Sequence, residues 1–257
     1  MADEIGGMKE LSGKVAIVTG SARNIGRASA LELARAGASV MVHAKTSADH
    51  CQETVEMIRA LGGQAEYRLA DVTDPDAVTG LVSETAELFG GIDILVSNAA
   101  DRSACRFQDL DWDLFSRTVD IALGGLFHLA KAGWPELAKR GGGSIIAMGG
   151  MTSFTGLIHR AHVTAAKSAV SGLIRNLALD LAEENIRANT IMVGQIETVN
   201  ADGSPKKKPH DGTIDIPLGR LGQPQDIAGF VRFLSGPAAS YITGQSLHCN
   251  GGALTVP

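Results

Sequence analysis

The sequence predicts an α/β fold: a doubly wound parallel sheet of about seven strands, with helices on both faces, in a single domain of residues 1–257. Short runs of apolar or β-branched residues alternate with longer amphipathic runs along the whole chain, which is typical of parallel strands joined by helices. No internal repeat or interdomain linker interrupts this alternation. Of the 257 residues, 44% are hydrophobic and 20% are charged, so the chain can bury one large core.

Each expected element follows from the period of its apolar residues. A strand is expected where four to six apolar or β-branched residues follow one another, and a helix where a longer amphipathic run comes next. The expected strands are residues 15–19, 39–43, 65–69, 92–97, 144–148, 188–193 and 246–249. The expected helices are residues 25–36, 48–61, 75–89, 112–139, 163–183 and 224–234.

Composition excludes several classes of function. The formal net charge of -5 argues against general affinity for nucleic acid or for an anionic membrane. No apolar run approaches the roughly 18 residues that a membrane span needs, and residues 1–14 lack the apolar core of a secretory signal. The three cysteines are odd in number and far apart, so we expect free thiols, no metal site and a cytoplasmic protein.

The most irregular segment is the loop of residues 194–222, which contains three prolines and few apolar residues. A loop of this length inside a compact domain is usually functional, so we expect a lid over a substrate. The loop also carries Lys206, Lys207 and Lys208 in succession. A solvated turn is the preferred interpretation of this run, and a contact with an acidic substrate group is the alternative.

A glycine-rich turn follows the first expected strand. Residues 15–19 lead into Gly20 and, six residues later, Gly26, and a helical pattern begins at once. A strand, a tight turn and a helix N-terminus direct backbone N–H groups and the positive end of the helix dipole toward a pyrophosphate. Gly20 would form the turn, and Gly26 would let helix and cofactor approach closely. An ordinary strand-to-helix turn is the alternative.

The chain resembles the short-chain dehydrogenase/reductase family in several motifs that occur in the family's order. Thr19-Gly20 with Gly26 resembles the family's glycine motif, and Asn24 stands where a middle glycine is usual. The resemblance spans about residues 11–252 and implies a Rossmann fold and a nicotinamide-dependent oxidoreductase. Asp71-Val72 matches the family's adenine-contacting pair, and Ser97-Asn98-Ala99-Ala100 matches its Asn-Asn-Ala-Gly motif. Residues 186–194 match the segment around the nicotinamide, with Val193 in place of proline. Residues 217–220, 241–245 and 250–252 match the C-terminal signature.

The resemblance also implies which residues contact the cofactor. They come from the glycine turn, from the ends of the third, fourth and sixth strands, and from the long helix that follows the fifth strand. These residues are Gly20, Ser21, Arg23, Asn24, Ile25, Gly26, Asp71, Val72, Asn98, Ala99, Lys167, Gly194, Ile196 and Thr198, with Lys45 added from the argument that follows.

The end of the second expected strand favours NADP(H) over NAD(H). An acid there would bind the adenosine ribose and repel a 2′-phosphate, but the residues after Val42 are His43, Ala44 and Lys45. Lys45 and Arg23 can converge on this corner, and two cations suit a phosphate. Family members with basic residues at these two places tend to use NADP. We therefore expect NADP(H), with NAD(H) possible and two plain surface charges as the alternative.

Only one of the catalytic residues that the resemblance implies is present. The family uses a tyrosine as proton donor or acceptor, a lysine four residues later, a serine thirteen residues before the tyrosine and an asparagine on the preceding helix. Lys167 matches the lysine, whereas the other positions hold Val163, Gly150 and Asp120. Neither of the chain's two tyrosines is near this region. A positioned acid or base contributes about 10²–10⁴ in rate, which valine cannot supply.

Two histidines precede the vacant tyrosine position and are candidate replacements. His162 is adjacent to Val163, and His159 lies one turn earlier on the approach to the helix. Histidine titrates near neutral pH and is therefore a reasonable general acid or base. Against this role, His162 points about 100° around the helix from position 163. A surface or interface role is the alternative for both histidines.

Other polar groups nearby can take part as well. Asp120 can polarise a water molecule or pair with Lys167, and we count Asp120, His162, His159 and Lys167 as the candidate catalytic residues. Thr152 or Ser153, just after Gly150, can offer a hydroxyl to a carbonyl oxygen.

Three functions are compatible with these residues. The preferred one is an NADP(H)-dependent oxidoreductase with an altered acid/base set, acting on a small carbonyl compound, an alcohol or an activated alkene. The second is a catalytically silent cofactor-binding subunit that regulates or scaffolds an active relative. Non-redox chemistry on the same fold ranks last, because the glycine turn can still hold a phosphate.

Family members usually form dimers or tetramers through the two long helices that match residues 112–139 and 163–183. We accordingly expect a homotetramer or a homodimer. Small residues on the second helix would permit close approach of a partner helix, although packing of a helix on the sheet uses small residues too. These residues are Ala165, Ala166, Ala169 and Gly172.

Overall fold

Parallel strands form one seven-stranded sheet in the computed structural model, which describes residues 9–200, 202–205 and 215–255. The sheet order β3-β2-β1-β4-β5-β6-β7 confirms the doubly wound arrangement expected from the sequence. Lys206, Lys207 and Lys208 lie outside the described residues. The strands are β1 (Val15–Val18), β2 (Ser39–Ala44), β3 (Ala65–Leu69), β4 (Ile94–Ser97), β5 (Gly143–Met148), β6 (Ile186–Val193) and β7 (Ser246–Cys249).

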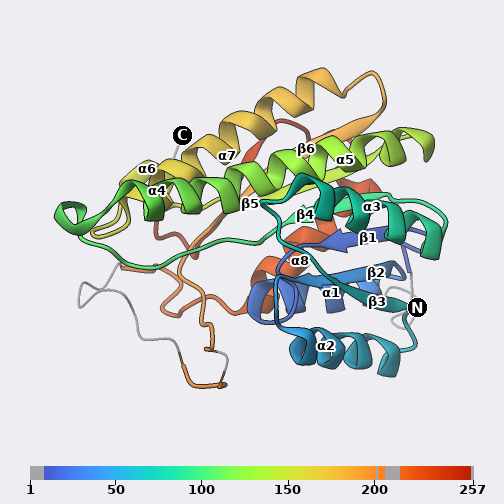
Figure 1. Cartoon of the computed structure of the whole chain (residues 1–257), viewed down its shortest axis with the longest axis horizontal. Coiled ribbons are helices and arrows are strands. Elements are labelled where there is room, and N and C mark those ends of the chain that lie inside the picture. The colour runs from blue at the N-terminus through green and yellow to red at the C-terminus, as the bar shows by residue number, and fades with distance from the viewer. Residues whose placement is uncertain (1–8, 201, 206–214, 256–257) are drawn as a thin grey trace.

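The helices cover both faces of this sheet. Figure 1 shows α3, α5 and α7 on one side of the strands and α1, α2 and α8 on the other. The helices are α1 (Asn24–Arg35), α2 (Ala48–Ala60), α3 (Pro75–Phe89), α4 (Trp112–Val119), α5 (Gly125–Lys139), α6 (Thr152–Thr155), α7 (Ala161–Asp180) and α8 (Pro224–Ser235), with short 3₁₀ turns at Phe107–Asp109 and Pro237–Ala239.

Two hydrophobic cores result, one on each face of the sheet. Successive residues of a strand point to opposite faces, so Ala16 and Val18 of β1 pack in the core under α1, α2 and α8. Ile17, between them, packs in the core under α3, α5 and α7. Because the central strands are buried on both sides, their sequences are continuously apolar rather than alternating.

Local signals set the ends of the connecting helices. Helix α3 begins after Asp74, whose carboxylate accepts hydrogen bonds from the N–H groups of Asp76 (2.9 Å) and Ala77 (3.2 Å). Pro75 occupies the first helical position, where its missing N–H costs nothing. Gly90 ends the helix with a φ of 82°, a left-handed conformation that favours glycine.

The expected helical segment 112–139 is present with these bounds, but it contains an irregular turn that the sequence did not indicate. A π-helical turn, Asp120–Gly124, separates α4 from α5, and the Gly125 N–H bonds to the carbonyl of Asp120, five residues back. Apolar periodicity cannot show one extra residue in a turn, because the flanking stripes continue on both sides. Such turns are frequent at functional sites, and this one brings Ile121 to the cleft described below.

Other boundaries differ by a few residues from the expected ones. Helix α7 starts two residues before the expected 163 and stops at Asp180 rather than 183, and β6 begins at Ile186 rather than 188. The short helix α6 was not expected, because four residues are too few to show a period.

The loop of residues 194–222 carries no helix or strand in its described part. Its regular pairings are two isolated bridges, Ile196 with Gly222 and Val199 with Pro205. The loop is also attached to the glycine turn, because the Asn24 side chain accepts from the Val199 N–H (2.8 Å) and donates to the Val199 carbonyl (3.0 Å). Asn24 adopts a φ of 53°, so the residue that replaces the family's usual glycine keeps a glycine-like backbone and gains this contact.

Three expectations concern groups elsewhere in the chain. Cys51, Cys105 and Cys249 are all free thiols, as predicted. Within the described residues, no group of His, Cys, Asp and Glu is arranged to hold a metal ion. In the same part of the chain, no helix combines the length and the apolar character that crossing a bilayer requires.

The closest contact at the start of α1 is between the two glycines of the turn. Gly20 has a φ of 65°, and a Cβ placed on Gly26 would lie 2.2 Å from the Gly20 carbonyl oxygen and 2.7 Å from the Asn98 amide nitrogen. Hydrogen bonds hold both the Gly20 carbonyl and the Asn98 amide in place, so neither group can move away from position 26. Helix α1 therefore approaches β1 and β4 at a distance that only glycine allows.

We predict that Gly26→Ala lowers the free energy of unfolding by about 3 kcal/mol or more, because the new methyl group overlaps backbone atoms. Gly229→Ala is the matched control. Gly229 lies inside α8 with no heavy atom within 4 Å of an added Cβ, so alanine should stabilise the helix by up to about 1 kcal/mol. Urea denaturation of the two variants measures both effects, and equal stabilities would show that the turn is not constrained.

Candidate active site

A cleft of about 770 Å³ opens at the carboxyl ends of the strands. The chain order reverses between β1 and β4, which is where open parallel sheets bind ligands, and the volume is typical of a small-molecule site. The structure brings most of the predicted cofactor residues together here. Those that line the cleft are Gly20, Arg23, Asn24, Ile25, Gly26, Lys45, Asp71, Val72, Asn98, Ala99 and Lys167.

The glycine turn presents unpaired N–H groups to the cleft. The first N–H groups of a helix have no carbonyl partner within the helix, and in α1 these belong to Asn24, Ile25 and Gly26, all of which line the cleft. Together with the positive end of the helix dipole they can bind a phosphate. The missing side chain of Gly26 leaves the space for that approach. The turn therefore fits the pyrophosphate of a dinucleotide.

Asn98 fastens the end of β4 to this turn. Its amide nitrogen donates to the carbonyls of Thr19 and Gly20, each at 3.0 Å. In return, the Thr19 hydroxyl oxygen accepts from the backbone N–H groups of Asn98 (3.0 Å) and Ala99 (3.2 Å). Asn98 thus shapes the turn in addition to lining the cleft.

His43, at the end of β2, is a residue of the site that the sequence did not indicate. Its Nδ1 accepts a hydrogen bond from the Gly20 N–H (3.2 Å), so the ring proton is on Nε2, which donates to the Ala70 carbonyl (2.9 Å). Burial lowers the pKa of His43 to about 4, so the ring is neutral near pH 7. His43 joins β2, the glycine turn and the end of β3. A single histidine in a strand carries no sequence pattern that would reveal this.

Ser21 supports the turn from inside and does not line the cleft. Its hydroxyl donates to the Val18 carbonyl (2.6 Å) and accepts from the His43 N–H (2.9 Å), and the residue is fully buried. The Ser21 N–H also donates within the protein, to the His43 carbonyl (2.8 Å), so the cofactor contact by Ser21 stays a prediction.

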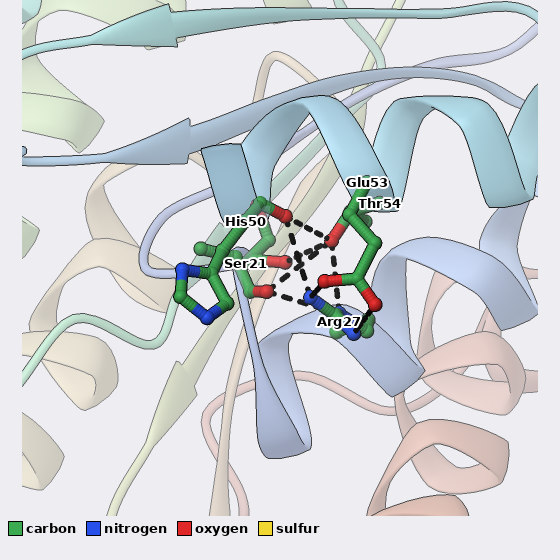
Figure 2. Close-up of polar contacts among 6 residues, drawn as sticks. Ser21, Arg27, His50, Glu53 and Thr54 are labelled. Atoms are coloured by element: carbon green, nitrogen blue, oxygen red, sulfur yellow. Dashed lines mark hydrogen bonds and ion pairs between the residues drawn. The ribbon is translucent and has the colours of Figure 1, made fainter. Parts of the chain in front are cut away.

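Helix α2 holds the same turn from the outside, as Figure 2 shows. The Arg27 Nε donates to the Ala22 carbonyl (2.9 Å) and to the Thr54 hydroxyl (3.0 Å). The two terminal nitrogens of Arg27 bind the carboxylate of Glu53 at 2.9 and 2.7 Å. A two-point ion pair of this kind is geometrically specific, so it fixes α2 against the first turn of α1.

At the end of the cleft next to β2, one cation has an ion-pair partner and a second has none among the described residues. Lys45 binds Asp71 at 2.5 Å, and this contact lowers the pKa of the Asp71 carboxyl. Arg23 has a buried terminal nitrogen, Nη1, that has no hydrogen-bond partner among the described residues. A buried guanidinium nitrogen without a partner is costly, and an anionic group in the cleft would relieve that cost.

The other end of the cleft contains Lys167. Its Nζ is buried and donates to the Met148 carbonyl at 2.5 Å. Burial, with a smaller contribution from the nearby charge of Arg102, lowers the pKa of Lys167 to about 7. Val163, one turn earlier on α7, is buried, and Gly150 lies close enough that an added Cβ would be 4.0 Å from the Lys167 Cγ.

The other three catalytic candidates are not among the residues that line the cleft. His162 is fully buried, and its Nε2 lies 3.0 Å from the Ser103 carbonyl, which requires a proton on that nitrogen. His159 is exposed, with a φ of 62°. Asp120 is exposed at the start of the π-helical turn. Of the four candidates, the structure brings only Lys167 to the cleft.

The last residue of β6, Val193, and Asn200 in the following segment line the cleft, whereas the three predicted residues of this region do not. Gly194 packs on Asn250, since an added Cβ would be 2.5 Å from the Asn250 Cα. Ile196 lines a separate cavity of about 110 Å³, and Thr198 lines neither cavity. Sequence motifs mark where this segment lies but not how its side chains turn.

Comparison with known proteins gives relatives over nearly the whole chain. A family model described as Enoyl-(Acyl carrier protein) reductase matches residues 20–254. The chain is 36% identical over 248 residues to L-rhamnose 1-dehydrogenase (NAD(P)(+)) of Sphingomonas sp. (strain SKA58), covering 95% of this chain and 98% of that protein. It is 37% identical over 250 residues to 7alpha-hydroxysteroid dehydrogenase of Escherichia coli (strain K12), covering 95% of each.

Solved structures give the same result. A 7 alpha-hydroxysteroid dehydrogenase complexed with NADH and 7-oxo glycochenodeoxycholic acid is similar with a TM-score of 0.86 and 36% identity, covering 95% of both chains. A structure described as a putative short-chain alcohol dehydrogenase from Sinorhizobium meliloti 1021 gives a TM-score of 0.87 at 34% identity, covering 96% of this chain and 98% of that chain. The chain therefore belongs to the short-chain dehydrogenase/reductase family.

Proposed function

We propose that this chain is an NADP(H)-dependent oxidoreductase that acts on a small carbonyl compound, an alcohol or an activated alkene, with NAD(H) as a possible second cofactor. The observation that carries the proposal is the single cleft that joins the glycine turn to Lys167. A nicotinamide bound there would supply or accept a hydride. The protein's own residues hold the nucleotide, orient the second ligand and exclude water.

The adenosine end supports the preference for NADP(H). No acid follows β2, and Arg23 offers a buried nitrogen that lacks a partner among the described residues. Lys45 is close enough to assist, although it is paired with Asp71 and must share its charge with that carboxylate. A 2′-phosphate would therefore be held mainly by Arg23, with Lys45 as the second cation.

The acid/base set of this site is altered relative to the family pattern. Val163 stands in the tyrosine position and Gly150 in the serine position, so neither a phenol nor a serine hydroxyl is available there. The Thr152 hydroxyl lies 3.4 Å from where a Cβ on Gly150 would be. We assign Thr152 as the hydroxyl that donates to the carbonyl oxygen, in preference to its neighbour Ser153. Lys167 would bind the ribose hydroxyls.

A catalytic role for the remaining candidates requires a change from the arrangement seen here. His162 would have to release the Ser103 carbonyl, and His159 and Asp120 would have to turn toward the cleft. Lys167 already lies in the cleft and has a pKa near neutrality, which suits proton transfer. We therefore favour Lys167 as the titrating group and keep His162, His159 and Asp120 as secondary candidates.

We further propose a homotetramer or a homodimer formed through α4, α5 and α7. Large apolar side chains are exposed on all three helices, namely Trp112, Phe127 and Leu179. On α7, Ala165 and Ala169 are exposed one turn apart, so a second helix can approach closely.

The free cysteines fit a cytoplasmic location, and the 194–222 loop is proposed as the lid over the substrate.

The proposed activity predicts that the purified protein oxidises NADPH, and NADH more weakly, in the presence of some ketones, aldehydes or activated alkenes. The absorbance of the reduced nicotinamide follows the reaction. Gly150→Ser combined with Val163→Tyr should increase turnover, because the pair restores the hydroxyl and the phenol of the family pattern, and an added Cβ at position 150 has no atom closer than 3.4 Å. Thr152→Val should lower kcat by about 10²-fold. Thr155→Val, which removes an exposed hydroxyl from the same helix, should not.

Different failures of this experiment have different meanings. Tight NADPH binding without turnover, also in the double variant, would instead indicate a silent cofactor-binding subunit. Absence of binding to either nucleotide in calorimetry would remove the proposal altogether.

The shifted pKa of Lys167 predicts a dependence of stability on pH. The group titrates at about 7 in the native protein against an ordinary value of 10.5, so between these values only the unfolded chain binds the proton. The stability of the wild type relative to Lys167→Met should therefore rise with pH over this range, by at most about 1.4 kcal/mol per pH unit. Below pH 7 the difference should be constant.

Denaturation of the nucleotide-free protein at several pH values measures this difference. Lys131→Met, at an exposed lysine of α5, is the control and should show no such trend. A flat difference between pH 7 and 10 for Lys167→Met would mean that Lys167 keeps its proton in the native state.

The proposed assembly predicts a solution mass of two or four chains by light scattering. Ala169→Arg places a long charged side chain on the exposed face of α7 and should dissociate the assembly. Ala60→Arg, at the exposed end of α2 on the other side of the sheet, should leave the mass unchanged. A wild-type monomer at micromolar concentration would contradict this part of the proposal.

A further inference from the structure

The cleft holds an arginine that neither the sequence motifs nor the proposed cofactor contacts account for. Arg102, five residues after the end of β4, lines the cleft beside Lys167 and Met148. It is open to the cleft but surrounded by protein, and this environment, followed by the charge of Arg160, lowers its pKa. Among the described residues, the Arg102 side chain forms no hydrogen bond and no ion pair.

Positive charge exceeds negative charge around Arg102. Arg160 is close enough to repel it, and the Arg160 Nε is buried without a hydrogen-bond partner in the described part of the chain. The nearby acid, Asp101, is already occupied, because it accepts from the Ser103 N–H (2.8 Å) and faces Arg117 at 3.5 Å. The buried Arg160 Nε is unfavourable without a partner, and the exposed Arg102 side chain is available to an anion that enters the cleft.

The backbone holds this corner in place over Lys167. The Ser103 carbonyl is bound by His162 (3.0 Å), and the Cys105 N–H donates to the His159 carbonyl (3.0 Å). The segment that carries Arg102 is therefore attached at two points to the beginning of α7, the helix that carries Lys167. The arginine is positioned on the side of the cleft where the reacting group of a substrate would lie.

The cofactor's 2′-phosphate is not the natural partner of this arginine. Lys45 lies at the end of β2, whereas Met148 ends β5, three strands away in the sheet. At the spacing of about 4.8 Å between strands, the two ends of the cleft are separated by roughly 14 Å. A phosphate bound by Arg23 and Lys45 therefore leaves the charge of Arg102 unpaired.

We infer that Arg102, reinforced by Arg160, binds an anionic group of the substrate, so that the substrate is a carbonyl compound or alcohol carrying a carboxylate or a phosphate. This inference rests on the proposed oxidoreductase function, since it assigns the second ligand of the same cleft. The guanidinium group matches the two oxygens of either anion. Anchoring the anion would orient the neighbouring carbonyl toward the Lys167 side of the cleft.

Calorimetric titration with matched compounds tests the inference. The probes are benzoylformate against its methyl ester and glyceraldehyde 3-phosphate against glyceraldehyde, each with nucleotide-free and with NADP-saturated protein. At least one anion should bind about 10-fold or more tightly than its neutral counterpart, and the pair that shows the difference identifies carboxylate or phosphate. Arg102→Gln should weaken that anion by about 10- to 100-fold, whereas Arg102→Lys should keep part of the affinity.

Arg106→Gln is the matched control, because Arg106 is exposed on the same segment, is not among the residues that line the cleft and faces Asp109 at 4.0 Å. It should leave anion affinity unchanged. Equal binding of charged and neutral compounds, or an unchanged affinity in Arg102→Gln, would overturn the inference. So would an equal loss of NADP affinity in Arg102→Gln, which would assign the arginine to the cofactor. Failure of NADP to bind the wild type would instead remove the proposed function, and the nucleotide-free titrations would still report on Arg102.

Discussion

The contact between Gly26 and the Gly20 carbonyl is the constraint on which the rest of the site depends. It brings the first turn of α1 against the ends of β1 and β4 at a distance that excludes any side chain at position 26. Because α1 is held against the ends of β1 and β4, the free N–H groups of its first turn face the cleft. Asn98, His43 and Ser21 are then arranged around the turn as its supports.

Polar side chains near the cleft form hydrogen bonds that hold the fold together, and these bonds limit which of them can react with a ligand. Two histidines close to the cleft, His43 and His162, each bind a backbone carbonyl that belongs to a neighbouring loop. A ring nitrogen that holds a loop cannot transfer a proton without releasing that loop. Of the candidate catalytic residues, Lys167 lines the cleft and has a pKa near neutrality, and its Nζ donates to the Met148 carbonyl.

Charge is distributed unevenly along the cleft. Near β2 the cleft has Lys45 paired with Asp71 and Arg23 without an ion-pair partner among the described residues, while its other end has Lys167, Arg102 and one acid, Asp101. The chain as a whole is acidic, with a net charge of -5. Cations outnumber acids among the residues that line the cleft, and this excess is the basis on which we propose a phosphorylated cofactor and an acidic second ligand.

Sequence alone determined the order of strands and helices, the glycine turn and the position of Lys167. Each of these is encoded locally, in the period of apolar residues, in the spacing of two glycines or in a motif of a few neighbours. The same patterns predicted Arg23, Lys45, Asp71 and Asn98 at the cleft, because the carboxyl ends of parallel strands meet at one edge of the sheet.

Only the tertiary structure decided which side chains remain available once the chain has folded. The Ser21 hydroxyl binds the Val18 carbonyl and the His162 Nε2 binds the Ser103 carbonyl, whereas Arg102, which belongs to no recognisable motif, forms no ion pair among the described residues. The physical reason is that hydrogen bonds and ion pairs in this fold join residues tens of positions apart. Local periodicity contains no information about which of those distant partners will meet.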